Sequence, residues 1–189
     1  MIKTTLLLTL CVAVATTTYV TGQAPVVTVA SATTTSNDKI AALSPWIGHW
    51  KGESLSRMGP GEMKRSTVDE RIESRLEGAI LLIEGIGKAT DAKTNQETIV
   101  HHALAVLSYD QAEQKYKFRS YLDNGRSTDA WFNVISSTQY QWGFDTPRGK
   151  MRYNITIDPA KKTWTETGEF SSDDKTWNKF IDMTLTRVD

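Results

Sequence analysis

The stretch KYKFRSYLDNGRSTDAWFNV, residues 115–134, decides the fold class. In its first half Tyr116 and Phe118 alternate with lysine and arginine, as expected for a β-strand with one buried face. Residues 123–125, Asp-Asn-Gly, then form a tight hairpin turn of the Asn-Gly type. A second strand follows over residues 126–135. The stretch therefore predicts an antiparallel β-hairpin.

The same pattern repeats from residue 46 to the C-terminal end. Apolar and polar residues alternate over runs of about eight to twelve residues. The runs are separated by turn-forming clusters such as DQAEQ, DPAKK and SSDDK. No segment after residue 46 has room for a long helix. We predict ten strands, at residues 46–56, 65–76, 79–89, 97–109, 115–123, 126–135, 138–145, 149–157, 162–171 and 176–188.

Ten consecutive strands joined by short hairpins form a meander, which has two free edges unless it closes on itself. Closure gives an all-β, up-and-down antiparallel barrel with alternate residues inside. A two-sheet sandwich is the alternative, but uninterrupted short hairpins favour the barrel. A short helical turn at residues 37–43 is expected to plug one end of this barrel.

The first 22 residues have the pattern of a cleaved secretory signal peptide. Lys3 provides an early positive charge, the apolar run 6–15 follows, and cleavage is expected between Gly22 and Gln23. This apolar run is too short to span a membrane, although an uncleaved N-terminal anchor is the alternative. The mature chain is therefore expected to be secreted or periplasmic, without a membrane span.

Residues 23–40 are rich in threonine, serine, alanine and valine and predict a flexible tether, so the barrel domain is assigned to residues 41–189. The chain contains 22 basic and 22 acidic residues, and no basic stripe, which disfavours nucleic acid and anionic membranes as partners. The one cysteine, Cys11, lies in the signal peptide. The mature chain therefore has no thiolate for catalysis or metal binding.

The two ends of the predicted barrel carry a recognisable combination. Gly48, His49 and Trp50 begin the first strand, and Arg187 ends the last. This combination resembles the calycin-type barrels, which include lipocalins, fatty-acid-binding proteins and nitrobindins. The resemblance implies that Gly48 and Trp50 lie at the closed end of the barrel with Arg187 packed across the indole. A guanidinium over an indole contributes about 0.5–2 kcal/mol.

Four longer pieces extend this resemblance. The segments LSPWIGHWKGE, RLEGAILLIEG, LSYDQAEQKYKFRSYLDNG and WTETGEFSSDDKTWNKFIDMTLTR together resemble a family of small exported bacterial proteins of unknown function. Nitrobindins hold haem through a histidine near the C-terminal end of the barrel. This chain has no histidine after His102, so that ligand is missing and no cofactor is expected.

Strand parity selects the polar residues that are expected inside. His102 shares parity with Val100 and Leu104, so we predict that it faces the interior while His101 faces solvent. Because neighbouring strand residues face opposite sides, the two histidines cannot jointly bind one ion, and no metal site is predicted. Glu70 and Glu166 also fall on inward parity, where a carboxylate must be paired, hydrogen-bonded or protonated.

Six aromatic residues share inward parity and form the predicted lining of a ligand-binding site: Tyr116, Phe118, Tyr140, Trp142, Tyr153 and Trp164. Together with Glu70, His102 and Glu166 they suit a small apolar or amphipathic ligand that a few polar groups orient. Two alternatives remain. One is a barrel enzyme, an isomerase or hydrolase that uses His102 with Glu70 or Glu166 as acid and base. The other is a module that acts through its outer surface.

Overall fold

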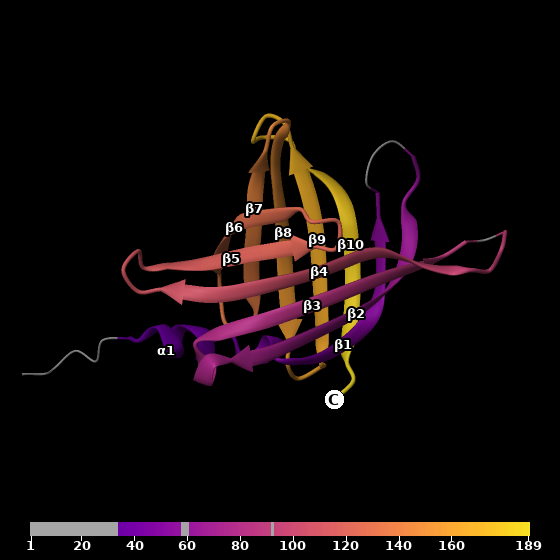
Figure 1. Ribbon diagram of the computed structural model, residues 1–189. Coiled ribbons are helices and arrows are strands. Elements are labelled where there is room, and N and C mark those ends of the chain that lie inside the picture. The colour runs from indigo at the N-terminus through magenta and orange to yellow at the C-terminus, as the bar shows by residue number, and fades with distance from the viewer. Residues whose placement is uncertain (1–33, 58–60, 92) are drawn as a thin grey trace, which may run out of the picture. The chain divides into compact units, whose positions relative to one another are not determined.

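The computed structural model describes residues 34–57, 61–91 and 93–189 (Figure 1). The predicted signal peptide, residues 1–22, and most of the predicted tether lie outside these residues. The last part of the range assigned to the tether does have regular structure, because helix α1 spans Ser36–Ala41. Thr35 caps this helix and forms a capping box with Asp38.

Ten antiparallel strands follow, which confirms the predicted fold class. The 3₁₀ turns η1 (Ser44–Trp46) and η2 (Leu76–Gly78) precede β1 and β3. The strands are β1 (Gly48–Ser56), β2 (Lys64–Arg75), β3 (Ile80–Thr90), β4 (Glu97–Asp110), β5 (Lys115–Leu122), β6 (Ser127–Val134), β7 (Gln139–Thr146), β8 (Gly149–Asp158), β9 (Thr163–Ser171) and β10 (Asn178–Arg187).

Each strand pairs with its neighbours in sequence, and β1 pairs with β10, so the sheet is a closed barrel. Indigo β1 and yellow β10 lie side by side in Figure 1. Closure removes both free edges, and it gives every backbone group of the first and last strands a possible partner. The prediction of a barrel rather than a sandwich is therefore confirmed.

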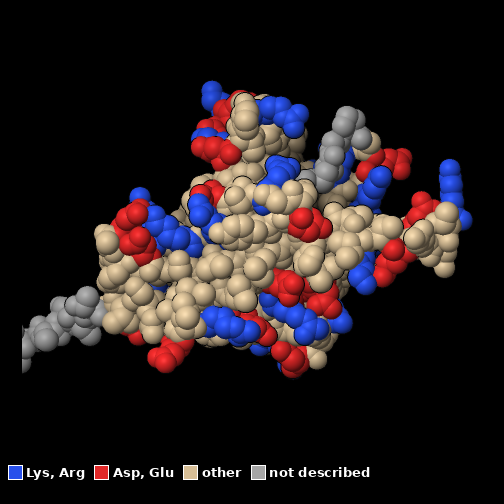
Figure 2. All heavy atoms as spheres, in the orientation of Figure 1, with Lys and Arg blue, Asp and Glu red and all other residues tan. Residues whose placement is uncertain are grey.

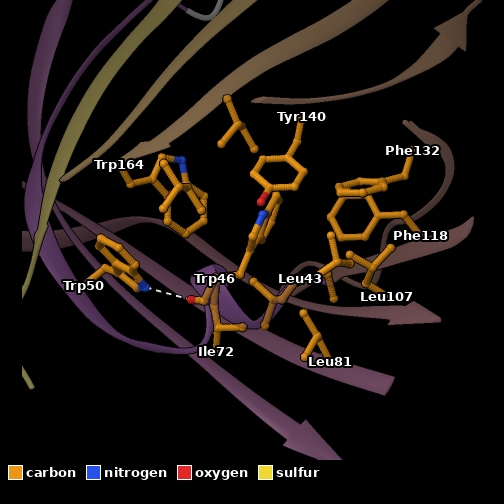
Figure 3. Packing of buried hydrophobic residues seen from close by; sticks show 14 of the residues in the cluster. Leu43, Trp46, Trp50, Ile72, Leu81, Leu107, Phe118, Phe132, Tyr140 and Trp164 are labelled. Carbon is orange, nitrogen blue, oxygen red and sulfur yellow. Dashed lines mark hydrogen bonds between the residues drawn. The ribbon is translucent and has the colours of Figure 1, made fainter. Parts of the chain in front are cut away.

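One end of the barrel is filled by the residues that precede β1. Ile40 of α1, Leu43 and Trp46 are all buried and belong to the hydrophobic core. Trp46 makes edge contacts with Phe132 and Tyr140, at ring-centre distances of 5.5 and 5.2 Å (Figure 3). This set of side chains forms a solid floor, and the predicted plug is confirmed, with Trp46 as its centre.

The seam between β1 and β10 is held at this floor by Trp50 and Arg187. Trp50 is completely buried and its indole N–H donates to the Trp46 carbonyl at 2.8 Å (Figure 3). The Arg187 guanidinium lies 4.6 Å from the Trp50 ring centre, and its Nη2 donates to the carbonyls of Pro45 and Ile47 at 2.7 and 2.6 Å. The arrangement that the family resemblance implies is present here.

Gly48 makes room for this guanidinium. Its φ of +142° lies in a region that L side chains rarely adopt, and a Cβ placed there would lie 3.0 Å from Arg187 Nε. A side chain at position 48 would therefore displace Arg187 from the first strand.

Replacing Arg187 is expected to weaken the whole barrel. Arg187→Leu leaves two carbonyls without their charged donor and exposes one face of Trp50, so we expect a loss of about 2–4 kcal/mol in the free energy of unfolding, measured by urea denaturation. Arg71→Leu is the control, because Arg71 is exposed on the outer face and has only a 3.7 Å ion pair with Asp69. Equal stability of the two variants would contradict this role for Arg187.

Candidate functional site

The predicted aromatic lining divides into two groups. Tyr116, Phe118, Tyr140 and Trp164 belong to or pack against the floor cluster. The Tyr116 hydroxyl donates to the Lys39 carbonyl of helix α1 at 3.0 Å, so its polar end helps to attach the plug to the barrel wall. These four residues therefore act mainly as core. Trp142 also packs against this cluster, but it is stacked on Tyr153, which lies outside the cluster.

Trp142 and Tyr153 form a face-to-face stacked aromatic pair inside the barrel. They are cross-strand neighbours on β7 and β8, with ring centres 3.8 Å apart and planes inclined by 3°. Phe118 packs edge-on against Trp142 at 5.0 Å. Trp142 remains partly exposed although it faces inward. The part of Trp142 that stays exposed is available for contact with a ligand.

Small residues line several inward positions on the other strands. The register pairs Gly85 of β3 with Ala103 of β4, Ala105 with Ser120 of β5, and Tyr153 with Gly168 of β9. Several inward residues keep exposed surface, among them Ala103, Ser120, Trp142 and Met151. The barrel is therefore not completely enclosed at these positions.

Glu166 points into this interior from β9. Its cross-strand neighbours are Ile155 and Met183, both buried, and only 8% of Glu166 is exposed. No described residue forms an ion pair with it. The indoles of Trp164 and Trp142 are its polar neighbours. Trp164 Nε1 has no partner at ordinary hydrogen-bond geometry, so its contact with the carboxylate is long or bent.

Glu70 enters the interior from β2. It lies opposite Trp50 on one side and Gly85 on the other. Its carboxylate rests over Gly85, where a Cβ would lie 2.4 Å from Oε1. The residue as a whole is partly exposed, yet the carboxylate is enclosed by protein. Gly85 is therefore the position that lets this acid lie inside the barrel.

Both acids hold their protons unusually strongly. Burial, followed by the charges of Glu166 and Asp69, raises the pKa of Glu70 to about 8. Burial raises the pKa of Glu166 to about 7, although hydrogen bonding from Trp164 and Trp142 opposes the rise. Burial and the charge of Glu166 also raise the pKa of the Tyr153 hydroxyl. No cation is among the groups that act on either acid. Near neutral pH the two acids are therefore not both fully ionised.

The structure corrects the predicted orientation of the histidines. His101, not His102, has inward parity, because it pairs with Gly87 while Ala103 and Ala105 line the interior. His102 lies on the outer face, where its Nε2 is 3.2 Å from Glu84. The prediction followed the larger apolar residues of β4, but this part of the interior is lined by the smaller ones. The His101 residue as a whole is exposed. Its imidazole ring is nevertheless partly covered by protein, and this burial lowers the pKa of the ring.

Two arginines, on strands β5 and β8, lie on the outer face of the barrel rather than beside the inward acids. Arg119 pairs with Asp129, and Arg152 pairs with Glu169 at 2.7 Å and covers the Trp177 ring at 3.8 Å. Figure 2 shows acidic and basic side chains interspersed over the face in view. This mixture is typical of a solvated surface.

Two depressions are present in the outer surface. One lies over β1–β3 and is lined by Lys51, Asp69, Arg71 and Lys88 among others, and the second lies between α1 and η2. Both are open to solvent, and neither includes an acid or aromatic residue of the predicted site. The inward-facing cluster therefore has the stronger claim to be the functional site.

Two features of the interior escaped sequence reasoning. Trp46 was assigned to the first strand, but it precedes β1 and enters the floor. Phe180 lies inside at 5.7 Å from Tyr153 because a β-bulge between Lys179 and Ile181 interrupts the alternation of β10. A bulge leaves no distinct signal in a single sequence. Pro45, in contrast, is a recognisable turn signal, and it indicates that the first strand begins after Trp46.

The sequence matches no protein-family profile and no curated protein. Within residues 34–57, 61–91 and 93–189, no three His, Cys, Asp or Glu side chains are grouped so as to hold a metal ion. None of the helices in this part of the chain is both long and apolar enough to cross a membrane. The assignment of a function therefore depends on the geometry of the interior.

The raised pKa values predict an unusual pH dependence of stability. The unfolded carboxyls ionise near pH 4.5, while the folded ones keep protons to about 7 and about 8, so the unfolding free energy should fall as pH rises from 5 to 8. Glu166→Gln removes one of these penalties and should stabilise the protein at pH 8 by on the order of 2–3 kcal/mol.

Chemical denaturation at pH 5, 6.5 and 8 measures both effects. Glu53→Gln is the matched control, because Glu53 lies on the outer face of β1 beside Arg65. Its stability should follow that of the unaltered protein at each pH. Stability that does not change between pH 5 and 8, or a Glu166→Gln variant that is less stable at pH 8, would contradict burial of this acid.

Proposed function

We propose that this chain is an exported, lipocalin-like barrel that binds a small apolar or amphipathic molecule in its interior. The closed ten-stranded barrel supports this proposal, because barrels of eight or more strands accommodate a ligand between their walls. The ligand would lie against the Trp142–Tyr153 pair, above the floor that Trp46 fills. Glu70 and Glu166 would orient its polar end.

The observation that carries the proposal is the unpaired carboxylate of Glu166. A barrel filled for stability alone would place an apolar side chain beside Ile155 and Met183, because an enclosed acid without an ion-pair partner destabilises the fold. The same interior retains partly exposed aromatic and small residues around this acid. A polar group surrounded by apolar walls is the usual composition of a small-molecule site.

The alternative of a barrel enzyme loses one of its expected groups. His102 lies on the outer face beside Glu84 and does not reach Glu70 or Glu166. The acid pair alone still has pKa values suited to proton transfer near neutral pH. Ligand binding requires only the features described here, whereas catalysis also requires a reacting group. We therefore favour binding.

Binding in the interior can be tested with a neutral fluorescent probe. N-phenyl-1-naphthylamine should bind with enhanced emission, and Ala103→Phe should weaken binding at least tenfold because its ring would enter the interior beside Glu70 and Gly85. Leu104→Phe is the matched control, since Leu104 is on the outer face of the same strand and 39% exposed. The proposal fails if the probe does not bind, or if the two variants bind it equally.

Export is a separate part of the proposal and has a direct test. The first 22 residues carry the signal-peptide pattern, so the mature chain should begin at Gln23. Intact mass measurement of protein expressed in a bacterial host should find this shortened chain outside the cytoplasm. A full-length chain that still begins at Met1 would contradict export by cleavage.

A further inference from the structure

The interior of the barrel carries acid without a matching cation. Among the inward positions of the ten described strands, the basic groups are Arg187 at the floor, His101 near the opposite end and Lys64 at the start of β2. Arg187 is already bound to two carbonyls and to Trp50, and Lys64 is exposed. Neither Arg187 nor His101 is among the groups that act on the two acids. Glu70 and Glu166 therefore have no counterion inside the barrel.

The neighbours of these acids define what kind of positive group would fit. Trp142 and Tyr153 form a stacked aromatic pair, and Glu166 lies on the neighbouring strand, one inward position away from Gly168, which is opposite Tyr153. Aromatic faces attract organic cations as well as apolar groups. A bare metal ion would find two carboxylates without a third protein ligand among the described residues. The aromatic walls and paired acids together suit an ammonium group with an apolar body.

We infer that the ligand of this barrel is an apolar amine, held by its ammonium group at the enclosed carboxylate of Glu166, with Glu70 as the second inward acid and its apolar body against Trp142 and Tyr153. This inference rests on the proposed function, because it names the class of ligand for the same interior. Binding would convert two isolated acids into ion-paired carboxylates, and it would satisfy Glu166 where the protein itself does not.

Proton release should accompany binding. The groups around the acids are Tyr153 on β8, Asp69 on the outer face of β2 and the indoles of Trp142 and Trp164. Tyr153 keeps its proton across the physiological range, and Asp69 stays ionised because its pKa is lowered, with its contacts to Lys51 and His49 outweighing its own burial. The two glutamic acids are therefore the groups that lose protons. Amine affinity should rise from pH 6 to pH 8.5, while a neutral ligand should show no such rise.

Three probes of matched shape separate this inference from the proposed function. They are 2-(2-naphthyl)ethylamine, 2-(2-naphthyl)ethanol and 2-naphthylacetate, each titrated by calorimetry at pH 6, 7 and 8.5. At pH 8.5 the amine should bind about ten- to a hundredfold more tightly than the alcohol, which is the effect of one charged hydrogen bond. The acetate should bind more weakly than the alcohol, because the interior already carries negative charge.

The variants then locate the ammonium group. Glu166→Gln and Glu70→Gln should each weaken amine binding about tenfold or more and leave alcohol binding within threefold, while Glu53→Gln changes neither. If the amine and the alcohol bind equally, or if both acid variants keep full amine affinity, the inference is wrong and the apolar site stands. If neither binds and the neutral fluorescent probe also fails, the proposed function is wrong.

Discussion

The ten strands form a closed sheet because β1 and β10 meet, and Arg187 holds this seam at the floor of the barrel. It covers Trp50, donates to two carbonyls that precede β1, and approaches Gly48 too closely for a side chain there. Trp50 in turn donates to Trp46, whose ring fills the floor. The closed end is thus a single connected unit in which first strand, last strand and plug are joined. The inward residues above this unit are not needed to close the barrel.

The upper interior contrasts with this floor in composition. Small residues such as Gly85 and Ala103 face inward, and Trp142 of the stacked aromatic pair remains partly exposed. Two acids are buried among these apolar walls without a cation from the described residues, and this burial raises the pKa of both. Such an arrangement lowers stability at neutral pH. A site that receives a positive ligand explains the arrangement, because the ligand supplies the positive charge that the protein does not place beside these acids.

Sequence periodicity was sufficient for the architecture. Each hairpin carries its own alternation and turn chemistry, so ten strands and their meander order follow from local signals. Parity also placed Glu70 and Glu166 inside. It was misleading on β4, where Leu104 and Val106 are larger than Ala103 and Ala105 yet face outward, and this reversed the two histidines. On β4, therefore, the larger apolar side chains did not mark the face that lines the interior. The bulge that turns Phe180 inward is likewise set by tertiary packing rather than by a local signal.

The central claim is that this barrel holds an apolar amine through its inner acids. A crystal structure of the mature chain grown with 2-(2-naphthyl)ethylamine at pH 8.5 tests it most directly. The account predicts the ligand nitrogen within about 3 Å of a carboxylate oxygen of Glu166 or Glu70. It also predicts the naphthyl ring against Trp142 and Tyr153. A ligand bound only on the outer surface, or an interior closed by side chains with both acids paired to protein groups, would contradict the account.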